Sequence, residues 1–175
     1  TNVKNEIVPY RGGRFYFTAG RVRRRGAELG ARVGTSAGVA VQAAVTWNSH
    51  HYTEYIVDSV HYGVPGATAD YGGNQVVGVP AFTGAFALDV SPATLKPVRL
   101  RLGVESLGSF YADDANQVKV PSYRIANVTV GTDNPVNLGA GLGISAFVTV
   151  NNRSDSRYIA SACLNPDVVT GEPGG

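Results

Sequence analysis

The residues best suited to metal chemistry are two adjacent acidic residues, Asp113 and Asp114, which stand in a polar stretch with Tyr111 and Asn116. Carboxylate and backbone carbonyl oxygens are the ligands that a hard cation such as Ca²⁺ prefers. The stretch does not have the spacing of an EF-hand loop. We therefore predict Asp113 and Asp114 as candidate Ca²⁺ ligands, with a solvated loop as the alternative.

Histidine could supply proton transfer, and the chain has three histidines, His50, His51 and His61. Adjacent strand residues point to opposite faces, so His50 and His51 cannot chelate one ion from a regular strand. A hydrolase would combine a cation on Asp113 and Asp114, polarising an ester or lactone carbonyl, with His51 as the proton carrier. The serine nucleophile motif G-x-S-x-G is absent from the sequence. We expect no catalysis and keep metal-assisted hydrolysis of esters or lactones as an alternative.

A third candidate is the segment Asp70-Tyr71-Gly72-Gly73-Asn74, which lies in the longest predicted loop, 49–81. Loops of this length are uncommon in compact domains unless they are functional. We predict that Asp70, Tyr71 and Asn74 bind a ligand. The single cysteine, Cys163, excludes an intrachain disulfide and a cysteine-rich zinc site, and its apolar neighbours indicate a buried or lipid-facing thiol.

These candidates lie between segments in which apolar and other residues alternate with a period of two, the pattern of β-strands. Turn-forming residues separate the segments, and no long 3.6-residue pattern is present. The predicted strands cover 27–33, 39–47, 82–90, 98–104, 123–130 and 136–150, with a further stretch at 52–60. We therefore predict an all-β fold, an antiparallel meander of about seven or eight long strands that forms a barrel segment or a small closed barrel.

The segment 136–150 shows the alternation over the greatest length. Its even positions are apolar and its odd positions are mostly Gly, Asn, Ser or Thr, with Phe147 as the exception. As one strand it would span about 50 Å, more than a small soluble sandwich needs. In the segment 98–104, Arg99 and Arg101 alternate with apolar residues and must face water, which a polar barrel lumen or an outside surface satisfies equally well.

Composition narrows the function classes. The net charge is +2, and the cluster at Arg21, Arg23, Arg24 and Arg25 has no base-reading or stacking motif beside it. We expect no nucleic-acid partner, and interpret the cluster as a solvated barrel rim or a lipid-headgroup contact. No run of about 18 apolar residues is present, so a transmembrane helix is excluded while a membrane barrel is not.

Four segments, in order along most of the chain, resemble one protein family. Arg25-Gly26-Ala27-Glu28 is similar to an R-G-x-E strand motif, and Val79-Pro80-Ala81-Phe82 to the entry of a later strand. Pro121-Ser122-Tyr123 with Asn127 resembles P-S-Y-x-x-x-N, and Asn151-Asn152 with Asp155 and Tyr158 resembles N-N-x-x-D-x-x-Y. The family with these motifs is that of TonB-dependent outer-membrane receptors. Phe82 departs from the basic residue or His usual at its position.

The resemblance implies a barrel segment from a bacterial outer membrane. The parent receptor would take up a nutrient such as a siderophore, cobalamin or glycan with TonB as its partner, through a barrel of about 22 strands that holds a plug domain. Residues 1–175 would be a single barrel segment without the plug or the final barrel strand, and would not transport alone.

One expectation about assembly and one alternative fold accompany this interpretation. The open strand edges predict a homo-oligomer formed edge to edge, because unpaired backbone groups seek partners. A soluble β-sandwich binding module stays the alternative fold.

Overall fold

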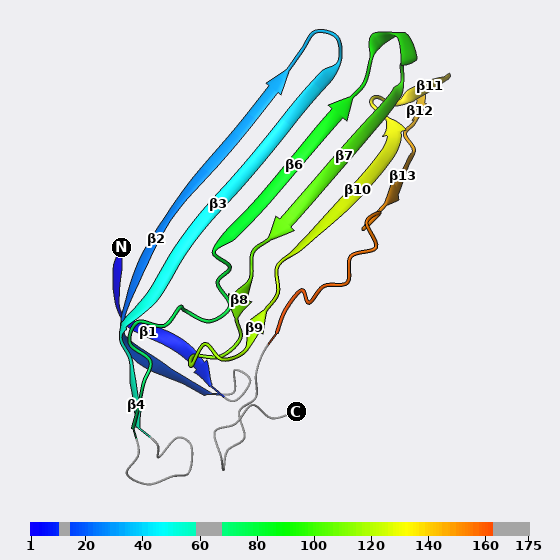
Figure 1. Ribbon diagram of the computed structural model, residues 1–175. Helices are drawn as coiled ribbons and strands as arrows, with labels where there is room; N and C mark the ends of the chain where they lie inside the picture. Colours follow the sequence, from blue (N-terminus) through cyan, green and yellow to red (C-terminus); the bar gives the residue numbers. More distant parts are fainter. Residues whose placement is uncertain (11–14, 59–67, 163–175) are drawn as a thin grey trace.

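The computed structural model describes residues 1–10, 15–58 and 68–162 and shows one large antiparallel sheet (Figure 1). Seven strands lie in the order β1-β2-β3-β6-β7-β10-β13. Their bounds are β1 Asn2–Tyr10, β2 Phe15–Gly34, β3 Val39–Glu54, β6 Phe82–Val90, β7 Val98–Leu107, β10 Tyr123–Thr132 and β13 Phe147–Val150. Each strand pairs with the preceding member of the order, which confirms the predicted all-β meander and its two central hairpins.

Three two-stranded sheets complete the described structure. They are β4 Ile56–Asp58 with β5 Thr68–Asp70, β8 Phe110–Tyr111 with β9 Lys119–Val120, and β11 Val136–Gly139 with β12 Leu142–Ile144. A short 3₁₀ helix, η2 Ala93–Leu95, lies between β6 and β7. No helix in the described part of the chain is long and apolar enough to span a bilayer.

The two ends of the large sheet differ in the length of their connections. At one end, the short turn 35–38 joins β2 to β3 and 91–97 joins β6 to β7. These turns touch, since Ser91 N donates to Gly38 O at 2.7 Å, and a Cβ at Gly38 would collide with the Ser91 carbonyl. At the other end lie the long connections 55–81 and 108–122 (Figure 1). We call these ends the short-turn end and the long-loop end.

The prediction of one long strand over 136–150 is wrong. The structure has the hairpin β11-β12 and then a separate strand, β13. Gly139, Ala140 and Gly141 take φ values of +89°, +50° and +76°, and Asn137 Oδ1 accepts a 2.8 Å hydrogen bond from Gly139 N. A left-handed backbone reverses the chain here, a conformation that glycine adopts freely and that alternation of residue types does not report.

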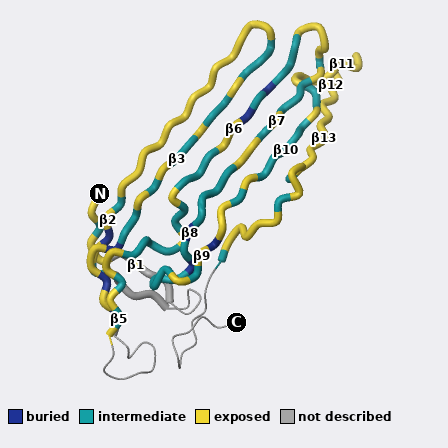
Figure 2. Tube along the Cα trace, in the orientation of Figure 1, coloured by how far each residue is buried: buried dark blue, intermediate teal, exposed yellow. Residues whose placement is uncertain are grey.

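The packed core lies at the long-loop end. One cluster contains the buried side chains of Val22, Tyr52, Tyr55 and Val57, and a second contains Phe110, Ala112 and Val120. Along the rest of the sheet, large apolar side chains such as Leu29, Leu102 and Val148 are exposed. Figure 2 shows exposed positions following β2 and β13. The large sheet is therefore a single layer with little core of its own.

This arrangement decides between the predicted alternatives. In the described residues β1 and β13 lie at opposite edges and do not pair, so the small closed barrel is not formed. No second large sheet packs on the first among these residues, so the β-sandwich alternative is wrong. The structure corresponds to the barrel segment.

Candidate functional site

The large sheet has one apolar and one polar face, because residues opposite one another in adjacent strands share a face. One row runs across six strands and is apolar throughout: Val33, Val41, Leu88, Leu102, Val128 and Val150. The next row, one residue along, is polar or small throughout: Gly34, Ala40, Asp89, Arg101, Thr129 and Thr149. We call the first side the outward face and the second the lumen face, since this division is typical of a membrane barrel.

An aromatic pair ends the apolar part of the outward face toward the long-loop end. Trp47 and Phe82 are directly opposite in β3 and β6, with ring centroids 5.9 Å apart. The next pair along β2 and β3 is Arg25 with Ser49. Aromatic residues at the edge of an apolar band are typical of the interface between hydrocarbon and headgroups.

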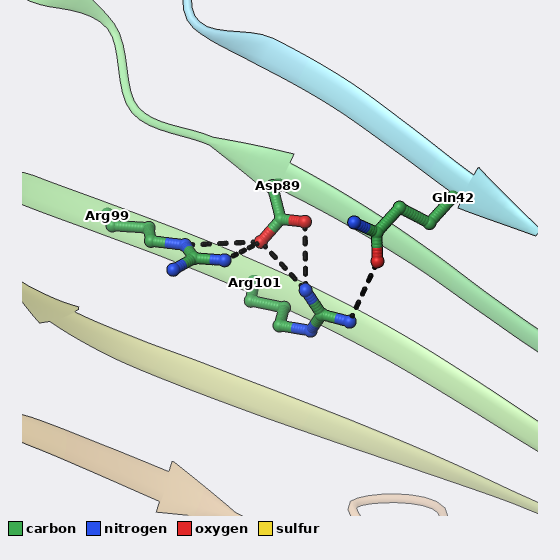
Figure 3. Close-up of polar contacts among 4 residues, drawn as sticks. All are labelled: Gln42, Asp89, Arg99 and Arg101. Carbon is green, nitrogen blue, oxygen red and sulfur yellow. Dashed lines mark hydrogen bonds and ion pairs between the residues drawn. The ribbon is translucent and has the colours of Figure 1, made fainter. Parts of the chain in front are cut away.

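An ion-pair cluster occupies the lumen face near the short-turn end (Figure 3). Arg99 Nη2 lies 2.6 Å from Asp89 Oδ1, and Arg101 Nη1 lies 2.9 Å from Asp89 Oδ2. The Asp89 side chain is 8% exposed, whereas the two arginine side chains are 41% and 40% exposed. Asp89 is thus satisfied by two guanidinium groups that still face open space.

Gln42 extends this cluster across the sheet toward β2. Its Oε1 accepts a 3.3 Å hydrogen bond from Arg101 Nη2 (Figure 3). With the amide turned over, the oxygen accepts instead from Arg32 Nη1 and Nε, both at 3.2 Å. The Gln42 amide oxygen therefore accepts from Arg101 or from Arg32, depending on its orientation, while Asp89 pairs with Arg99 and Arg101. The lumen face is hollowed beside it by about 680 Å³, with Arg32, Gln42, Arg101 and Glu105 among the lining residues.

The two predicted Ca²⁺ ligands lie in the loop between β8 and β9, where both carboxylates have partners within the chain. Asp113 Oδ1 and Oδ2 accept hydrogen bonds from Val118 N at 2.7 Å and Gln117 N at 3.0 Å. Asp114 Oδ1 accepts from the Tyr52 hydroxyl at 2.7 Å and Oδ2 from the Tyr55 hydroxyl at 3.1 Å. The pair therefore shapes its own loop and ties it to β3. The Ca²⁺ site stays a prediction.

Burial raises the pKa of the Asp114 carboxyl above its ordinary value. The hydroxyls of Tyr52 and Tyr55 lower it by hydrogen bonding, and the negative charge of Asp113 raises it further, so the net direction is upward.

The three predicted ligand-binding residues lie next to this loop. Asp70 is exposed, and its Oδ1 accepts a 2.8 Å hydrogen bond from Gly72 N. Tyr71 is half-buried, with its ring 5.4 Å from that of Tyr55. Asn74 Nδ2 donates to the backbone oxygen of Asp114 at 2.8 Å. Asp70 and Tyr71 thus reach the surface of the long-loop end, while Asn74 joins its two loops.

The predicted proton carrier, His51, lies in β3 beside Tyr52. Tyr52 reaches Asp114, whereas the adjacent strand residue points to the opposite face. No group of three His, Cys, Asp or Glu side chains in the described ranges is placed to hold a metal ion. His61 and Cys163 lie outside the described residues. The hydrolase alternative has gained no supporting geometry.

Two of the family-like motifs contact each other where β10 meets the segment after β13. Asn127 Oδ1 accepts a 2.9 Å hydrogen bond from Asn152 N, and the rings of Tyr123 and Tyr158 stack with centroids 4.4 Å apart. Asn152 Oδ1 also accepts from Ser156 N at 3.0 Å, which closes a local turn. The spacing of both motifs therefore has a structural reason.

Sequence reasoning did not identify Asp89, Gln42, Tyr52 or Tyr55 as parts of a site. A usable signal existed for Asp89, because it continues the polar alternation of the β6-β7 hairpin that contains Arg99 and Arg101. No local signal existed for Tyr52, which meets Asp114 from 62 residues away.

Curated relatives match nearly the whole chain. The ferrichrome outer membrane transporter/phage receptor of Escherichia coli is 29% identical over 167 residues, which are 94% of this chain and 20% of that protein. The ferrioxamine receptor of Yersinia enterocolitica is 28% identical over 165 residues, 94% of this chain and 21% of that protein. The chain therefore spans about a fifth of the length of these relatives.

Solved structures give the same fold. The siderophore receptor PiuA from Acinetobacter baumannii aligns with a TM-score of 0.67 at 23% identity, covering 90% of this chain and 21% of that one. The ferric yersiniabactin uptake receptor FyuA from Yersinia pestis aligns with a TM-score of 0.65 at 22% identity, over the same shares. Residues 1–152 also match the family described as TonB dependent receptor-like, beta-barrel. With its single-layer antiparallel sheet and two chemically distinct faces, the chain belongs to the TonB-dependent receptor family as part of its β-barrel.

Proposed function

We propose that this chain forms part of the barrel wall of a bacterial outer-membrane receptor that takes up a ferric siderophore. The proposal rests on the apolar row that contains Leu102 and the adjacent polar row that contains Arg101. Two such faces suit a sheet with lipid on one side and an aqueous lumen on the other. The printed names of the relatives, a ferrichrome transporter and a ferrioxamine receptor, support the ligand class.

The difference in connection length between the two ends of the sheet indicates how the segment is oriented across the outer membrane. Outer-membrane barrels have short periplasmic turns and longer extracellular loops. The short-turn end would then face the periplasm and the long-loop end the exterior. In this orientation Asp70 and Tyr71 lie on the outer surface, where they would contact the arriving ligand, and Asn74 would support them through Asp114.

The remaining partners follow from the same proposal. Residues 1–175 act as a single barrel segment, and the receptor as a whole is energised by TonB. The open edges of the sheet offer unpaired backbone groups, at β1 and the part of β2 beyond it on one side and at β13 on the other. These groups pair with further barrel strands or, in the isolated chain, with another copy.

A chimaera tests this proposal. In the E. coli ferrichrome transporter, the 167-residue matching segment is replaced by this chain, and the chimaera is expressed in cells that lack their own ferrichrome receptor. We expect it in the outer membrane, with growth on ferrichrome or ferrioxamine as the iron source.

The matched control is the same chimaera carrying Leu88→Asp and Leu102→Asp. These changes place two charges in the outward apolar row and should prevent insertion. Recovery of the unmodified chimaera only as water-soluble protein would contradict the proposal.

A further inference from the structure

Strand β13 has an apolar pattern that does not by itself fix its position on β10. Apolar residues occupy every even position from 136 to 150, so a slip of two residues keeps the same face apolar. In the structure Val130 lies opposite Val148, and Val128 lies opposite Val150. After a slip of two residues Val130 would lie opposite Val150, with apolar side chains still paired. The alternation alone therefore leaves the register of β13 undecided.

The shifted register is already present in the adjoining hairpin β11-β12, which lies beyond the tip of β10 (Figure 1). Val136 of this hairpin lies opposite Ile144. The same ladder, extended along β10 and β13, would bring Val130 opposite Val150. The shifted register is therefore one that neighbouring residues of the same chain segments adopt.

An irregularity joins the two registers. Thr132 N donates to Ala146 O at 2.9 Å, so the ladder between β10 and β13 continues as far as this pair. Before the β11-β12 ladder begins, residues 133–135 lie on one side and Ser145 alone lies on the other. One side thus carries two more residues than the other, and a slip of β13 by two residues would absorb this excess into a single continuous hairpin.

The contact between Asn127 and Asn152 belongs to the observed register alone. Asn127 Oδ1 accepts a 2.9 Å hydrogen bond from Asn152 N. Asn152 has a φ of +50°, a left-handed conformation that asparagine tolerates, and its Oδ1 accepts a 3.0 Å hydrogen bond from Ser156 N. This closed turn ends the extended strand beside Asn127. After the slip Asn127 would lie opposite Arg153 and would lose its donor.

Two further contacts on the lumen face of β10 also belong to the observed register. The hydroxyls of Thr129 and Thr149 lie 3.0 Å apart. Gly131 lies opposite Phe147, and a Cβ on this glycine would stand 2.7 Å from the Phe147 Cβ. A larger residue at position 131 would therefore collide with Phe147. The slip would displace the partners of both pairs by about 6.7 Å.

We propose that Asn127 and Gly131 hold β13 in the observed register and prevent a two-residue slip along β10. Asn127 makes a hydrogen bond that the shifted register lacks, and Gly131 leaves the space that Phe147 needs. The slip would move the free edge of β13 by about 6.7 Å relative to the next barrel strand. A closed barrel needs one fixed stagger between its strands, so the register of β13 decides whether the segment fits the rest of the barrel. That consequence rests on the proposed function, whereas the register itself does not.

Pairs of cysteines distinguish the two registers. Directly opposite residues can form a disulfide, whereas diagonal neighbours lie about 7 to 8 Å apart, too far for one. In a Cys163→Ser background, Val130→Cys with Val148→Cys reports the observed register, and Val130→Cys with Val150→Cys reports the shifted one. The chain is oxidised in lipid vesicles, and disulfides are counted by mass spectrometry. We expect the first pair to crosslink about tenfold faster or more.

Two substitutions should reverse this preference. Asn127→Ala removes the acceptor for Asn152 N, and Gly131→Ala places a methyl group against Phe147. With both changes, we expect the ratio of the two crosslinking rates to fall by about tenfold or more. Asn151→Ala removes the neighbouring exposed amide and is the matched control, which should leave the ratio unchanged.

A third pair, Leu88→Cys with Leu102→Cys, joins β6 to β7 in either register of β13 and shows that the sheet is formed in each variant. A shift of crosslinking from position 148 to position 150 in the Asn127 and Gly131 variant supports the inference. An unchanged preference for 148 would overturn it. Loss of both crosslinks would overturn it as well, because β13 would then detach instead of slipping.

Two results with the other proteins would also count against the inference. Equal crosslinking at 148 and 150 in the otherwise unmodified chain would show that no single register is held. An equal shift in Asn151→Ala would assign the register to other contacts. None of these measurements involves uptake, so they test the register separately from the proposed function.

Discussion

The Tyr52 hydroxyl donates a 2.7 Å hydrogen bond to Oδ1 of Asp114 and so joins strand β3 to the loop between β8 and β9. Tyr52 is 2% exposed, and its ring lies 4.6 Å from that of Tyr55, which binds the other carboxylate oxygen. A partly buried polar contact beside an aromatic pair therefore joins two segments of the long-loop end.

Removing this hydroxyl should loosen the loop and leave the sheet intact. Tyr52→Phe keeps the ring packing and deletes one hydrogen bond to a charged group, a loss of about 1.5 to 3 kcal/mol in local stability. Hydrogen exchange over 112–118 should accelerate, with little change in β7 and β10. Tyr158→Phe, an exposed tyrosine at the same end, serves as the control. Unchanged exchange in Tyr52→Phe would show that the contact does not hold the loop.

The raised pKa of Asp114 makes the stability of the same loop depend on pH. A carboxyl whose folded pKa lies above its unfolded value, about 3.9, binds its proton more tightly in the folded state. Its contribution to the stability of the loop is most favourable at low pH and is lost as pH rises from about 3.9 through the raised folded pKa. We expect protection factors over 112–118, corrected for intrinsic exchange, to fall across that window. Asp114→Asn should flatten this dependence, and an unchanged slope in the variant would assign it to another group.

Asp89 should stabilise the short-turn end by joining β6 to β7. Asp89→Asn weakens four hydrogen bonds from Arg99 and Arg101 and leaves these two guanidinium groups without their carboxylate. We expect a loss of about 1 to 2 kcal/mol, because both arginines are partly solvated. Urea unfolding in lipid vesicles measures it, with the exposed Asp155→Asn as control. Equal midpoints for the two variants would contradict this role.

Without detergent, the isolated chain should associate. One copy in water cannot satisfy both the exposed outward face and the two open edges, which lie at β1 and the part of β2 beyond it on one side and at β13 on the other. Light scattering should report assemblies that dissociate when detergent is added. A stable, soluble monomer would refute association through these edges.

The strands and their two faces could be predicted from the sequence. The alternation of polar and apolar residues around Arg99 and Arg101 continues without interruption in β7 of the structure. The hairpin at 139–141 could not be predicted, because Ala140 adopts a left-handed backbone that its residue type does not favour. Asp113 and Asp114 were recognisable as an oxygen-rich pair. Their partners were not, because Tyr52 and Tyr55 approach Asp114 from 62 and 59 residues away through tertiary folding.

The central claim is that one face of the sheet contacts lipid and the other lines an aqueous lumen. Spin labels on single cysteines, placed in turn at positions 98 to 104 of β7 in a Cys163→Ser background, test it directly in lipid vesicles. Collision with oxygen, which concentrates in lipid, should be high at the positions of Leu100, Leu102 and Val104. Collision with a water-soluble nickel chelate should be high at Arg99, Arg101 and Gly103. Equal accessibility to the chelate on both faces would contradict the account.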